Sequence, residues 1–204
     1  MAINLKKGES INLSKREPNL RKIRVGLGWD KRAGGADFDL DVSVFVCNLN
    51  ATREPKLLGD EYFVFYNNKQ SPDGAVTHSG DNRTGDAAGD DESIIVDLGK
   101  INPQAQEISF VVTIHEAETR NQNFGQIQNA YIRLYDNDKV VADYDLDEMF
   151  SNETAVQFGS FFKQNDEWSF KAVGAGYRLT LGDFVEDGVV GAAVAERQLH
   201  RLVA

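Results

Sequence analysis

Residues 78–92 decide how the fold is read: His-Ser-Gly-Asp-Asn-Arg-Thr-Gly-Asp-Ala-Ala-Gly-Asp-Asp-Glu. The segments on either side, 75–78 and 93–98, have the composition of β-strands. The stretch therefore joins two strands, and its side chains are expected at one end of a sheet. Three of its residues are glycines, which let the backbone turn through positive φ at little steric cost.

The loop concentrates acidic residues, in the order Asp81, Asp86, Asp90, Asp91 and Glu92, with Asn82 next to the first of them. Carboxylates this close repel one another unless water screens them or a cation joins them. Carboxylate, amide and backbone carbonyl oxygens suit a hard cation, and Ca²⁺ takes about six to eight such oxygens in loose geometry. The loop therefore predicts a calcium site.

The loop is not an EF-hand. Asp81 and Glu92 have the separation of the first and last ligands of that motif. However, Arg83 and Gly85 occupy its third and fifth positions, where the motif requires acidic or amide side chains. A solvated, glycine-rich acidic surface loop is the alternative interpretation, because runs of charge are commonly exposed.

A second acidic run favours the metal interpretation. Within residues 36–45, aspartates alternate with apolar residues in the order Asp37, Phe38, Asp39, Leu40, Asp41 and Val42. Successive side chains of an extended chain point to opposite faces, so the carboxylates line one face about 7 Å apart while the apolar residues enter the core. Aspartate is disfavoured in strands, and a metal-facing sheet edge explains this run. A solvated strand end is the alternative.

Further oxygen donors follow the next expected strand, 61–66. The turn at 67–74 contains Asn68 and Asp73, and Pro72 and Gly74 mark it as a turn. These oxygens lie close in sequence to the acidic loop.

Zinc has little support. The chain has three histidines, His78, His115 and His200. His115 is followed by Glu116, like the start of a zinc-binding helix motif, but Thr119 stands where the second histidine is required. His78 borders the acidic loop, and we expect it to have a structural or hydrogen-bonding role.

Apolar alternation elsewhere predicts further strands. Two short strands are expected around Gly8 within 3–13, and the others at 23–29, 37–45, 107–115, 130–135, 139–144, 154–163, 167–173 and 177–184. Hairpin turns are expected at 136–138, 165–166 and 174–176. Gly26 and Gly28 occupy alternate positions of the strand at 23–29, where another backbone or a bulge can approach.

These segments predict an all-β protein. About ten strands separated by turns, with one or two short helices, are typical of an antiparallel β-sandwich. One short helix is expected at 145–151, because acidic residues occupy its first turn. We expect one domain over residues 1–188. Residues 189–204 differ in composition and form a C-terminal tail, either loose or weakly helical.

Composition limits the class of protein. Of 204 residues, 41% are hydrophobic, which is enough for a core. The net charge of −10 argues against nucleic acid as a partner and favours cations or basic partners. The single cysteine, Cys47, is expected to be a buried hydrophobe, and a chain without disulfides fits a reducing compartment. With no signal peptide and no membrane span expected, the predicted location is the cytoplasm.

Several motifs together resemble the TerD family, named for tellurium resistance. They are Gly26-Leu27-Gly28-Trp29-Asp30, Phe38-Asp39-Leu40-Asp41, Tyr66-Asn67-Asn68, the run from Ser71 to Gly85, Gly89-Asp90-Asp91-Glu92, and Gly174-Ala175-Gly176-Tyr177. The run from Asn67 to Glu92 is the most specific of these. The resemblance covers all but the last sixteen or so residues, and it does not separate the close paralogues of the family.

The resemblance implies a cytoplasmic, calcium-binding β-sandwich that acts in bacterial stress responses to tellurite, phage and pore-forming colicins. It also implies assembly with other Ter proteins and with membrane-associated Ter partners. The calcium ligands that it implies are Asp39, Asp41, Asn68, Asp81, Asp90, Asp91 and Glu92, followed by Asp37, Asp73, Asn82, Asp86 and Glu116. This number of acids suggests two adjacent ions.

Two classes of function follow. The first is a calcium-binding module without catalysis, which acts by recruiting partners. The second is a metal-dependent hydrolase in which the same acids hold Mg²⁺ or Mn²⁺, and a binder of small anions through the metal is a further alternative. The sequence contains no Ser-His-Asp spacing, nucleophile elbow or phosphate-binding loop. The non-catalytic module is therefore the preferred prediction.

Overall fold

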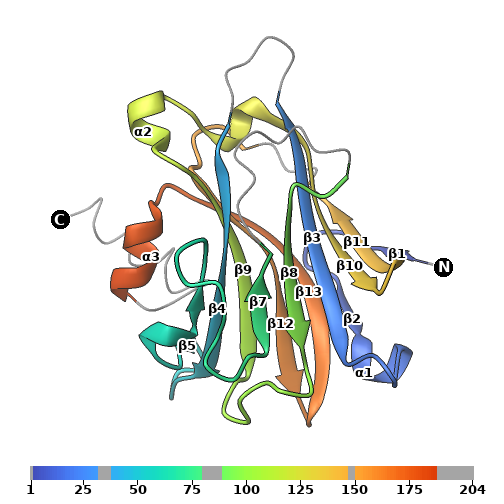
Figure 1. Cartoon of the computed structure of the whole chain (residues 1–204). Helices are drawn as coiled ribbons and strands as arrows, with labels where there is room; N and C mark the ends of the chain where they lie inside the picture. Colours follow the sequence, from blue (N-terminus) through green and yellow to red (C-terminus); the bar gives the residue numbers. More distant parts are fainter. Residues whose placement is uncertain (1, 32–37, 80–88, 147–149, 188–204) are drawn as a thin grey trace.

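The protein is a two-layered β-sandwich. The computed structural model describes residues 2–31, 38–79, 89–146 and 150–187. The first sheet runs in the order β1 (Ile3–Asn4), β11 (Lys139–Asp145), β10 (Ile127–Asp136), β3 (Lys22–Lys31), β8 (Glu92–Asp97) and β7 (Val76–His78) (Figure 1). The second runs β2 (Ser10–Asn12), β13 (Glu167–Tyr177), β12 (Ala155–Gln164), β9 (Glu107–Ile114), β4 (Leu40–Leu49) and β5 (Pro55–Leu57), and β6 (Phe63–Val64) also pairs with β4.

This arrangement confirms the prediction of an all-β antiparallel sandwich. Among the pairings of these strands, one is parallel, between β1 and β11. Strands were expected at the places of β1, β6 and β7, whereas β5, which is three residues long, was not expected. Segments this short carry little periodic signal.

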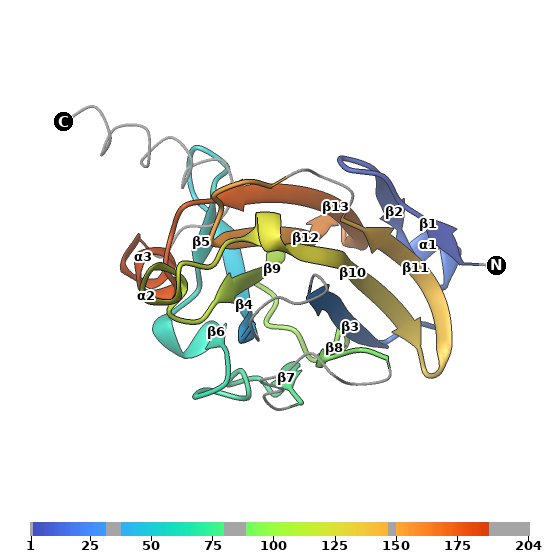
Figure 2. The same ribbon diagram turned by 90° about the horizontal axis from the view of Figure 1, so that it is seen from above.

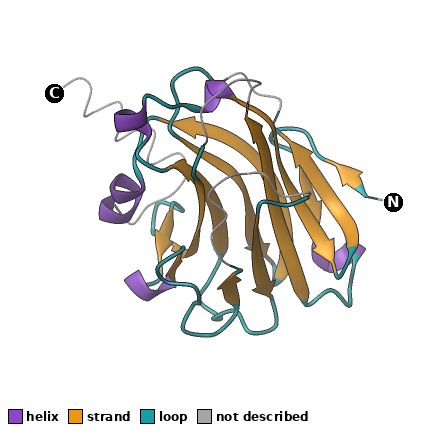
Figure 3. Ribbon diagram, turned by 45° about the horizontal axis from the view of Figure 1, so that its top comes forward, coloured by secondary structure: helices purple, strands orange, loops and turns teal. Residues whose placement is uncertain are grey.

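Helices lie outside the two sheets (Figure 3). They are α1 (Leu13–Arg16), α2 (Ala117–Arg120) and α3 (Leu181–Asp187), with 3₁₀ turns η1 (Asp60–Tyr62) and η2 (Phe124–Gln126). Within the described ranges, no helix has the length and hydropathy that crossing a membrane requires. The helix expected at 145–151 falls partly on residues 147–149, outside the described residues, and Asp145 ends β11.

The main core lies between the two sheets, which Figure 2 shows from above. In β4, alternate residues from Leu40 to Val46 are fully or almost fully buried there. Phe161 packs edge-on against Phe110 and Phe170, with ring centroids 5.5 and 5.3 Å apart. Burying each such side chain contributes about 1.5–3 kcal/mol, so the alternation predicted from the sequence is the main source of stability.

A second apolar cluster covers part of the outer face of the second sheet. Phe45 of β4 and Tyr177 of β13 point away from the main core and contact Phe184 of α3, with ring centroids 6.1 and 5.6 Å apart. Phe63 packs against Phe45 with the rings tilted and their centroids 4.8 Å apart. The outward residues of this sheet are therefore apolar where α3 covers them. Cys47 also belongs to this cluster and is buried, as predicted.

The strand predicted at 177–184 is wrong. Tyr177 ends β13, and α3 begins at Leu181. Thr180 and Asp183 explain the change, because the Thr180 backbone N–H and hydroxyl donate to Asp183 Oδ2 at 2.8 and 2.7 Å. The Asp183 backbone N–H donates back to the Thr180 hydroxyl at 3.3 Å. This reciprocal capping starts a helix.

The hairpin turn predicted at 174–176 is also wrong. These residues continue β13 through a β-bulge, where Ala175 pairs with Gln157 while Ala172 pairs with Gly159. Two residues of β13 therefore face one of β12. Gly174 takes φ of 59°, a conformation that glycine adopts readily. The turn predicted at Asn165-Asp166 is confirmed, since both residues have positive φ between β12 and β13.

The strand predicted at 61–66 is mostly replaced by a turn. Residues 60–62 form η1, and β6 keeps only Phe63 and Val64. Asn68 holds this shape, because its side-chain amide donates to the carbonyls of Glu61 and Phe63 at 3.2 and 2.6 Å. Phe65 and Asn68 also exchange two backbone hydrogen bonds of 3.0 Å. The chain thus reverses sooner than its apolar composition predicts.

Candidate metal centre

The structure describes eight of the twelve predicted metal ligands: Asp39, Asp41, Asn68, Asp73, Asp90, Asp91, Glu92 and Glu116. The other four, Asp37, Asp81, Asn82 and Asp86, lie outside the described residues. The structure therefore locates predicted ligands at the edges of both acidic runs.

The described residues Asp39, Asp41, Asp91 and Glu92 lie at the same end of the sandwich. β4 begins at Leu40, which pairs with Ile114 at the end of β9. This is the end that carries α2 in Figure 1. Glu92 starts β8 in the other sheet, and its Oε2 accepts a hydrogen bond of 2.7 Å from the Val42 backbone N–H. The Glu92 carboxylate at the start of β8 thus bridges to β4, the strand that carries Asp41.

Burial of negative charge is concentrated at this end. In the described part of the chain, the acidic residues classed as buried are Asp41, Asp91 and Glu92, with exposed fractions of 6%, 9% and 2%. All of them belong to the predicted ligand set. Burying a carboxylate is costly unless hydrogen bonds or a cation compensate it. The Trp29 backbone N–H supplies part of this compensation by donating to Asp91 Oδ2 at 3.0 Å.

Asp39 adds an oxygen suited to a cation. Its Oδ1 is buried and accepts no hydrogen bond within the described residues. Its backbone carbonyl accepts a hydrogen bond of 2.8 Å from the His115 backbone N–H, which ties it to the end of β9. Buried polar oxygens normally have a partner. A calcium ion would supply one at this position.

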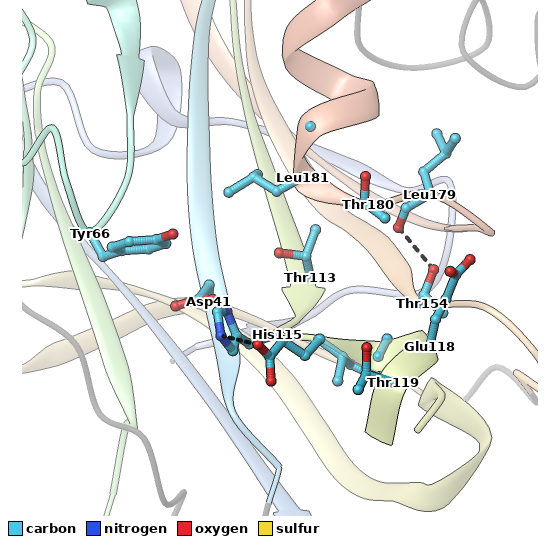
Figure 4. Close-up of a pocket in the computed structure, with 14 residues that line it drawn as sticks. Asp41, Tyr66, Thr113, His115, Glu118, Thr119, Thr154, Leu179, Thr180 and Leu181 are labelled. Carbon is cyan, nitrogen blue, oxygen red and sulfur yellow. Dashed lines mark hydrogen bonds and ion pairs between the residues drawn. The ribbon is translucent and has the colours of Figure 1, made fainter. Parts of the chain in front are cut away.

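A cavity of about 290 Å³ opens beside Asp41, between the end of β9 and the start of α3 (Figure 4). Asp41 Oδ2 lies 3.8 Å from His115 Nδ1, and the two side chains face each other in the figure. His115 Nε2 lies 3.9 Å from a carboxylate oxygen of Glu116. The predicted ligands Asp41 and Glu116 are therefore both neighbours of one histidine.

Asp90 is held differently from the other acids. Its carboxylate pairs with the Arg24 guanidinium and accepts hydrogen bonds of 3.1 and 3.0 Å from the hydroxyls of Tyr131 and Tyr135. Burial is the largest cause that raises the pKa of the Tyr131 hydroxyl, and the nearby Asp90 carboxylate is the second. The hydroxyl therefore stays protonated and can donate a hydrogen bond. The Arg24 guanidinium also stacks 3.6 Å from the centroid of the Tyr135 ring. Asp90 fixes the segment before Asp91 against β3 and β10.

The sequence analysis missed these partners of Asp90, although it noted the two glycines that make room for them. A Cβ atom at Gly26 would overlap the Asp90 carboxylate, and one at Gly28 would overlap the Tyr131 ring. The close approach is therefore made by side chains, and not by the backbone or bulge that was expected. The alternating glycines were the signal that could have located this contact.

Asn68 and Asp73 shape turns. Asp73 Oδ1 accepts hydrogen bonds from the Ser71 hydroxyl at 2.6 Å and the Ala75 backbone N–H at 2.9 Å. Its Oδ2 accepts one from the Asn102 backbone N–H at 2.9 Å. The amide of Asn68 donates to the carbonyls described above. These contacts account for both side chains locally, and their role as metal ligands stays a prediction.

Within 2–31, 38–79, 89–146 and 150–187, no group of three or more His, Cys, Asp and Glu side chains is arranged to hold a metal ion. His78 Nε2 lies 4.0 Å from Glu92 Oε2, in keeping with the structural role expected for it. Calcium binding at this end stays a prediction.

Comparison with known proteins places the chain in its family. Residues 1–187 match the TerD domain. "Tellurium resistance protein TerD" of Serratia marcescens is 50% identical over 87% of this chain and 92% of its own length. "General stress protein 16U" of Bacillus subtilis is 45% identical over 92% and 97%.

More distant relatives and a solved structure agree. "Tellurium resistance protein TerZ" of Serratia marcescens is 30% identical over 94% of this chain and 99% of its own length. A crystal structure described as a homologue of telluride resistance protein (TerD), from Streptomyces coelicolor A3(2), shares the fold with a TM-score of 0.66 and 22% identity, over 85% of this chain and all of that one. The chain belongs to the TerD family of tellurium-resistance and stress-response proteins.

Proposed function

We propose that this TerD-family chain is a calcium-binding stress-response module that acts by binding and assembly rather than by catalysis. The observation that carries the proposal is the concentration of buried carboxylates at one end of the sandwich. Asp41, Asp91 and Glu92 come from both sheets and belong to the two acidic runs. Their oxygen-only chemistry suits Ca²⁺.

About two ions would be held by Asp39, Asp41, Asp91 and Glu92, together with residues of the acidic runs at Asp37, Asp81, Asn82 and Asp86. Asp90 would position Asp91 and Glu92 through Arg24 and the two tyrosines. Calcium supplies positive charge that offsets repulsion among the carboxylates and links the start of β4 to the start of β8. It would therefore stabilise the contact between the two sheets.

A non-catalytic role rests on the chemistry of this end. Its carboxylates bridge strands and accept backbone hydrogen bonds, as Glu92 does from Val42 and Asp91 from Trp29. The proposal includes a cytoplasmic location and assembly with other Ter-family proteins, including a membrane-associated Ter complex. The net charge of −10 supports a basic surface on such a partner.

Thermal unfolding tests the calcium proposal. The protein is stripped with EDTA, dialysed, and melted alone, with Ca²⁺ and with Mg²⁺. Ca²⁺ at about a hundred times its Kd stabilises the folded state by about 2.7 kcal/mol. For a domain of this size, that raises the melting temperature by roughly 5–10 °C.

The Mg²⁺ sample is the control for non-specific screening of charge. Mg²⁺ demands near-octahedral geometry and keeps its waters, so its effect is expected to be much smaller. Equal effects of both ions would leave general screening as the explanation. No effect of either ion would contradict the calcium proposal and leave the acids as a solvated face.

A further inference from the structure

A groove of about 820 Å³ lies on the outer face of the second sheet, beyond the part that α3 covers. It is larger than the cavities of about 290 and 320 Å³ near the acidic end. β12 and β13 form its floor, and the connection between β4 and β5 forms one wall. None of the predicted calcium ligands lines it. The groove is therefore separate from the proposed metal centre.

Buried polar groups form a chain of hydrogen bonds along the floor. The Tyr177 hydroxyl donates to Gln157 Oε1 at 3.4 Å, and Gln157 Nε2 donates to the Ser109 hydroxyl at 3.2 Å. The Ser109 hydroxyl donates in turn to Glu107 Oε1 at 2.8 Å. Gln157 is 2% exposed and Ser109 is fully buried. Each hydrogen bond in this series is donated in the direction of the Glu107 carboxylate.

Glu107 stands where this chain of hydrogen bonds meets the groove. Its side chain is partly buried and lines the cavity. Burial raises its pKa, while hydrogen bonds from Ser109 and Ser160 and the positive charge of Lys171 act in the opposite direction. A carboxylate withdrawn from water and already supplied with hydroxyl donors is a favourable partner for a cationic group.

The rim has the opposite charge. Arg53, Lys163 and Lys171 line the groove in a chain whose net charge is −10. Lys163 also lies 3.2 Å from the carboxylate of Asp166, whereas the Lys171 side chain is exposed. Arg53 approaches from the connection between β4 and β5. Three cations around one opening favour an anionic group in the ligand.

The groove also has apolar walls. Leu49, Phe162 and Val173 contribute to them from three strands. Cavities of roughly 300–1,000 Å³ with apolar walls and a few converging polar groups are typical of sites for small organic ligands. The dimensions of the groove fall within this range.

We propose that this groove binds a small zwitterion of the α-amino acid class. Its ammonium group pairs with Glu107, its carboxylate with Lys171 and Arg53, and its apolar side chain lies against Phe162 and Val173. The charge of the groove carries the proposal, because one acid at the floor and cations at the rim complement a molecule that bears both charges. The proposal is independent of calcium.

The test uses the full chain labelled with ¹⁵N, titrated with leucine, isoleucine and phenylalanine. Saturable shifts of backbone amide signals in β12 and β13 are expected for at least one of them. For phenylalanine, 3-phenylpropionate lacks the ammonium group and phenethylamine lacks the carboxylate. Each analogue is expected to bind about tenfold more weakly, because each loses one charged hydrogen bond.

Two variants test the residues. Glu107→Gln keeps the shape of the side chain and one acceptor oxygen but removes its charge. Lys171→Met keeps much of the aliphatic stem of an exposed residue. Both are expected to weaken binding about tenfold. Glu61→Gln, on exposed η1 and outside the groove, is the matched control and keeps native affinity. A melting curve of each variant confirms that it folds.

Several results would overturn the proposal. One is the absence of saturable shifts with all three amino acids. Another is equal affinity for phenylalanine and for both of its singly charged analogues, because binding would then depend on neither charge of the ligand. A third is native affinity in both single variants, Glu107→Gln and Lys171→Met, when each of them is folded. Shifts centred on α2 and the start of β4 would assign the ligand to the acidic end instead.

Discussion

At the scale of single residues, Asp90 differs most from its expected role. The sequence grouped it with the other acids of the loop, and residue type alone gave no means of separating them. In the structure, Arg24, Tyr131 and Tyr135 engage its carboxylate over the outer face of β3. These partners are distant in sequence, so only the pairing of β3 with β10 brings them together.

Gly26 makes this contact testable. Gly26→Ala places a methyl group where the Asp90 carboxylate lies, so either the carboxylate or the strand must move. We expect a loss of about 1–3 kcal/mol in the free energy of unfolding, measured by urea denaturation. Gly182→Ala in α3 is the control, and it is expected to be neutral or stabilising because its Cβ has ordinary contacts. A Gly26→Ala protein as stable as the native one would refute the close packing.

Asp91 tests the buried charge at the acidic end. Asp91→Asn can keep an oxygen that accepts from the Trp29 backbone N–H, but it removes the negative charge. Ligand charge tunes calcium affinity, so we expect Kd to rise about tenfold or more in a competition assay with a fluorescent chelator. Asp138→Asn, in the exposed turn between β10 and β11, is the control with unchanged affinity. Equal affinity in the two variants would exclude Asp91 as a ligand.

Glu107 predicts a dependence of stability on pH. Burial raises its folded-state pKa above the ordinary value of 4.5. Its contribution to stability is therefore full below the unfolded pKa and is lost as pH rises through the folded pKa. Glu107→Gln does not titrate. Relative to the native protein, we expect it to gain stability from pH 4 to pH 7 in urea denaturation, and a constant difference over that range would contradict the raised pKa.

At the scale of elements, alternation predicted the central strands and failed where local signals were ambiguous. β4 and β9 follow from their apolar patterns, because both are long and one face of each enters the main core. In contrast, glycines such as those at 174 and 176 occur both in hairpin turns and in β-bulges, so they do not distinguish the two. The continuous pairing of β13 with β12 decides between the two, and pairing is not visible in one segment.

The last described element shows a missed capping signal. Residues 177–184 were expected to form a strand, while Thr180 and Asp183 carry the spacing of a helix cap. Thr180→Ala is expected to cost about 1 kcal/mol in urea denaturation, since the first turn of α3 loses its cap. Hydrogen exchange in α3 should rise with it. Thr119→Ala, exposed in α2, is the control, and equal stability of both variants would contradict the capping role.

At the scale of the whole molecule, the sandwich separates two chemical environments. The end that carries α2 gathers carboxylates from both sheets, whereas the groove over β12 and β13 combines one acid with three cations. The acidic end could be predicted because its residues form two dense runs in sequence. The groove could not, because Arg53, Glu107, Lys163 and Lys171 come from separate segments that only the second sheet assembles.

Calorimetric titration of EDTA-stripped protein with Ca²⁺ measures the central proposal most directly. The calcium-binding module predicts saturable binding of about two ions per chain with a Kd in the micromolar range or tighter, as roughly 10⁻⁷–10⁻⁵ M is typical of calcium sensors. Asp91→Asn should lower the affinity, and Mg²⁺ should bind far more weakly. Absence of saturable heat, together with no competition against a fluorescent calcium chelator, would contradict calcium binding by this chain.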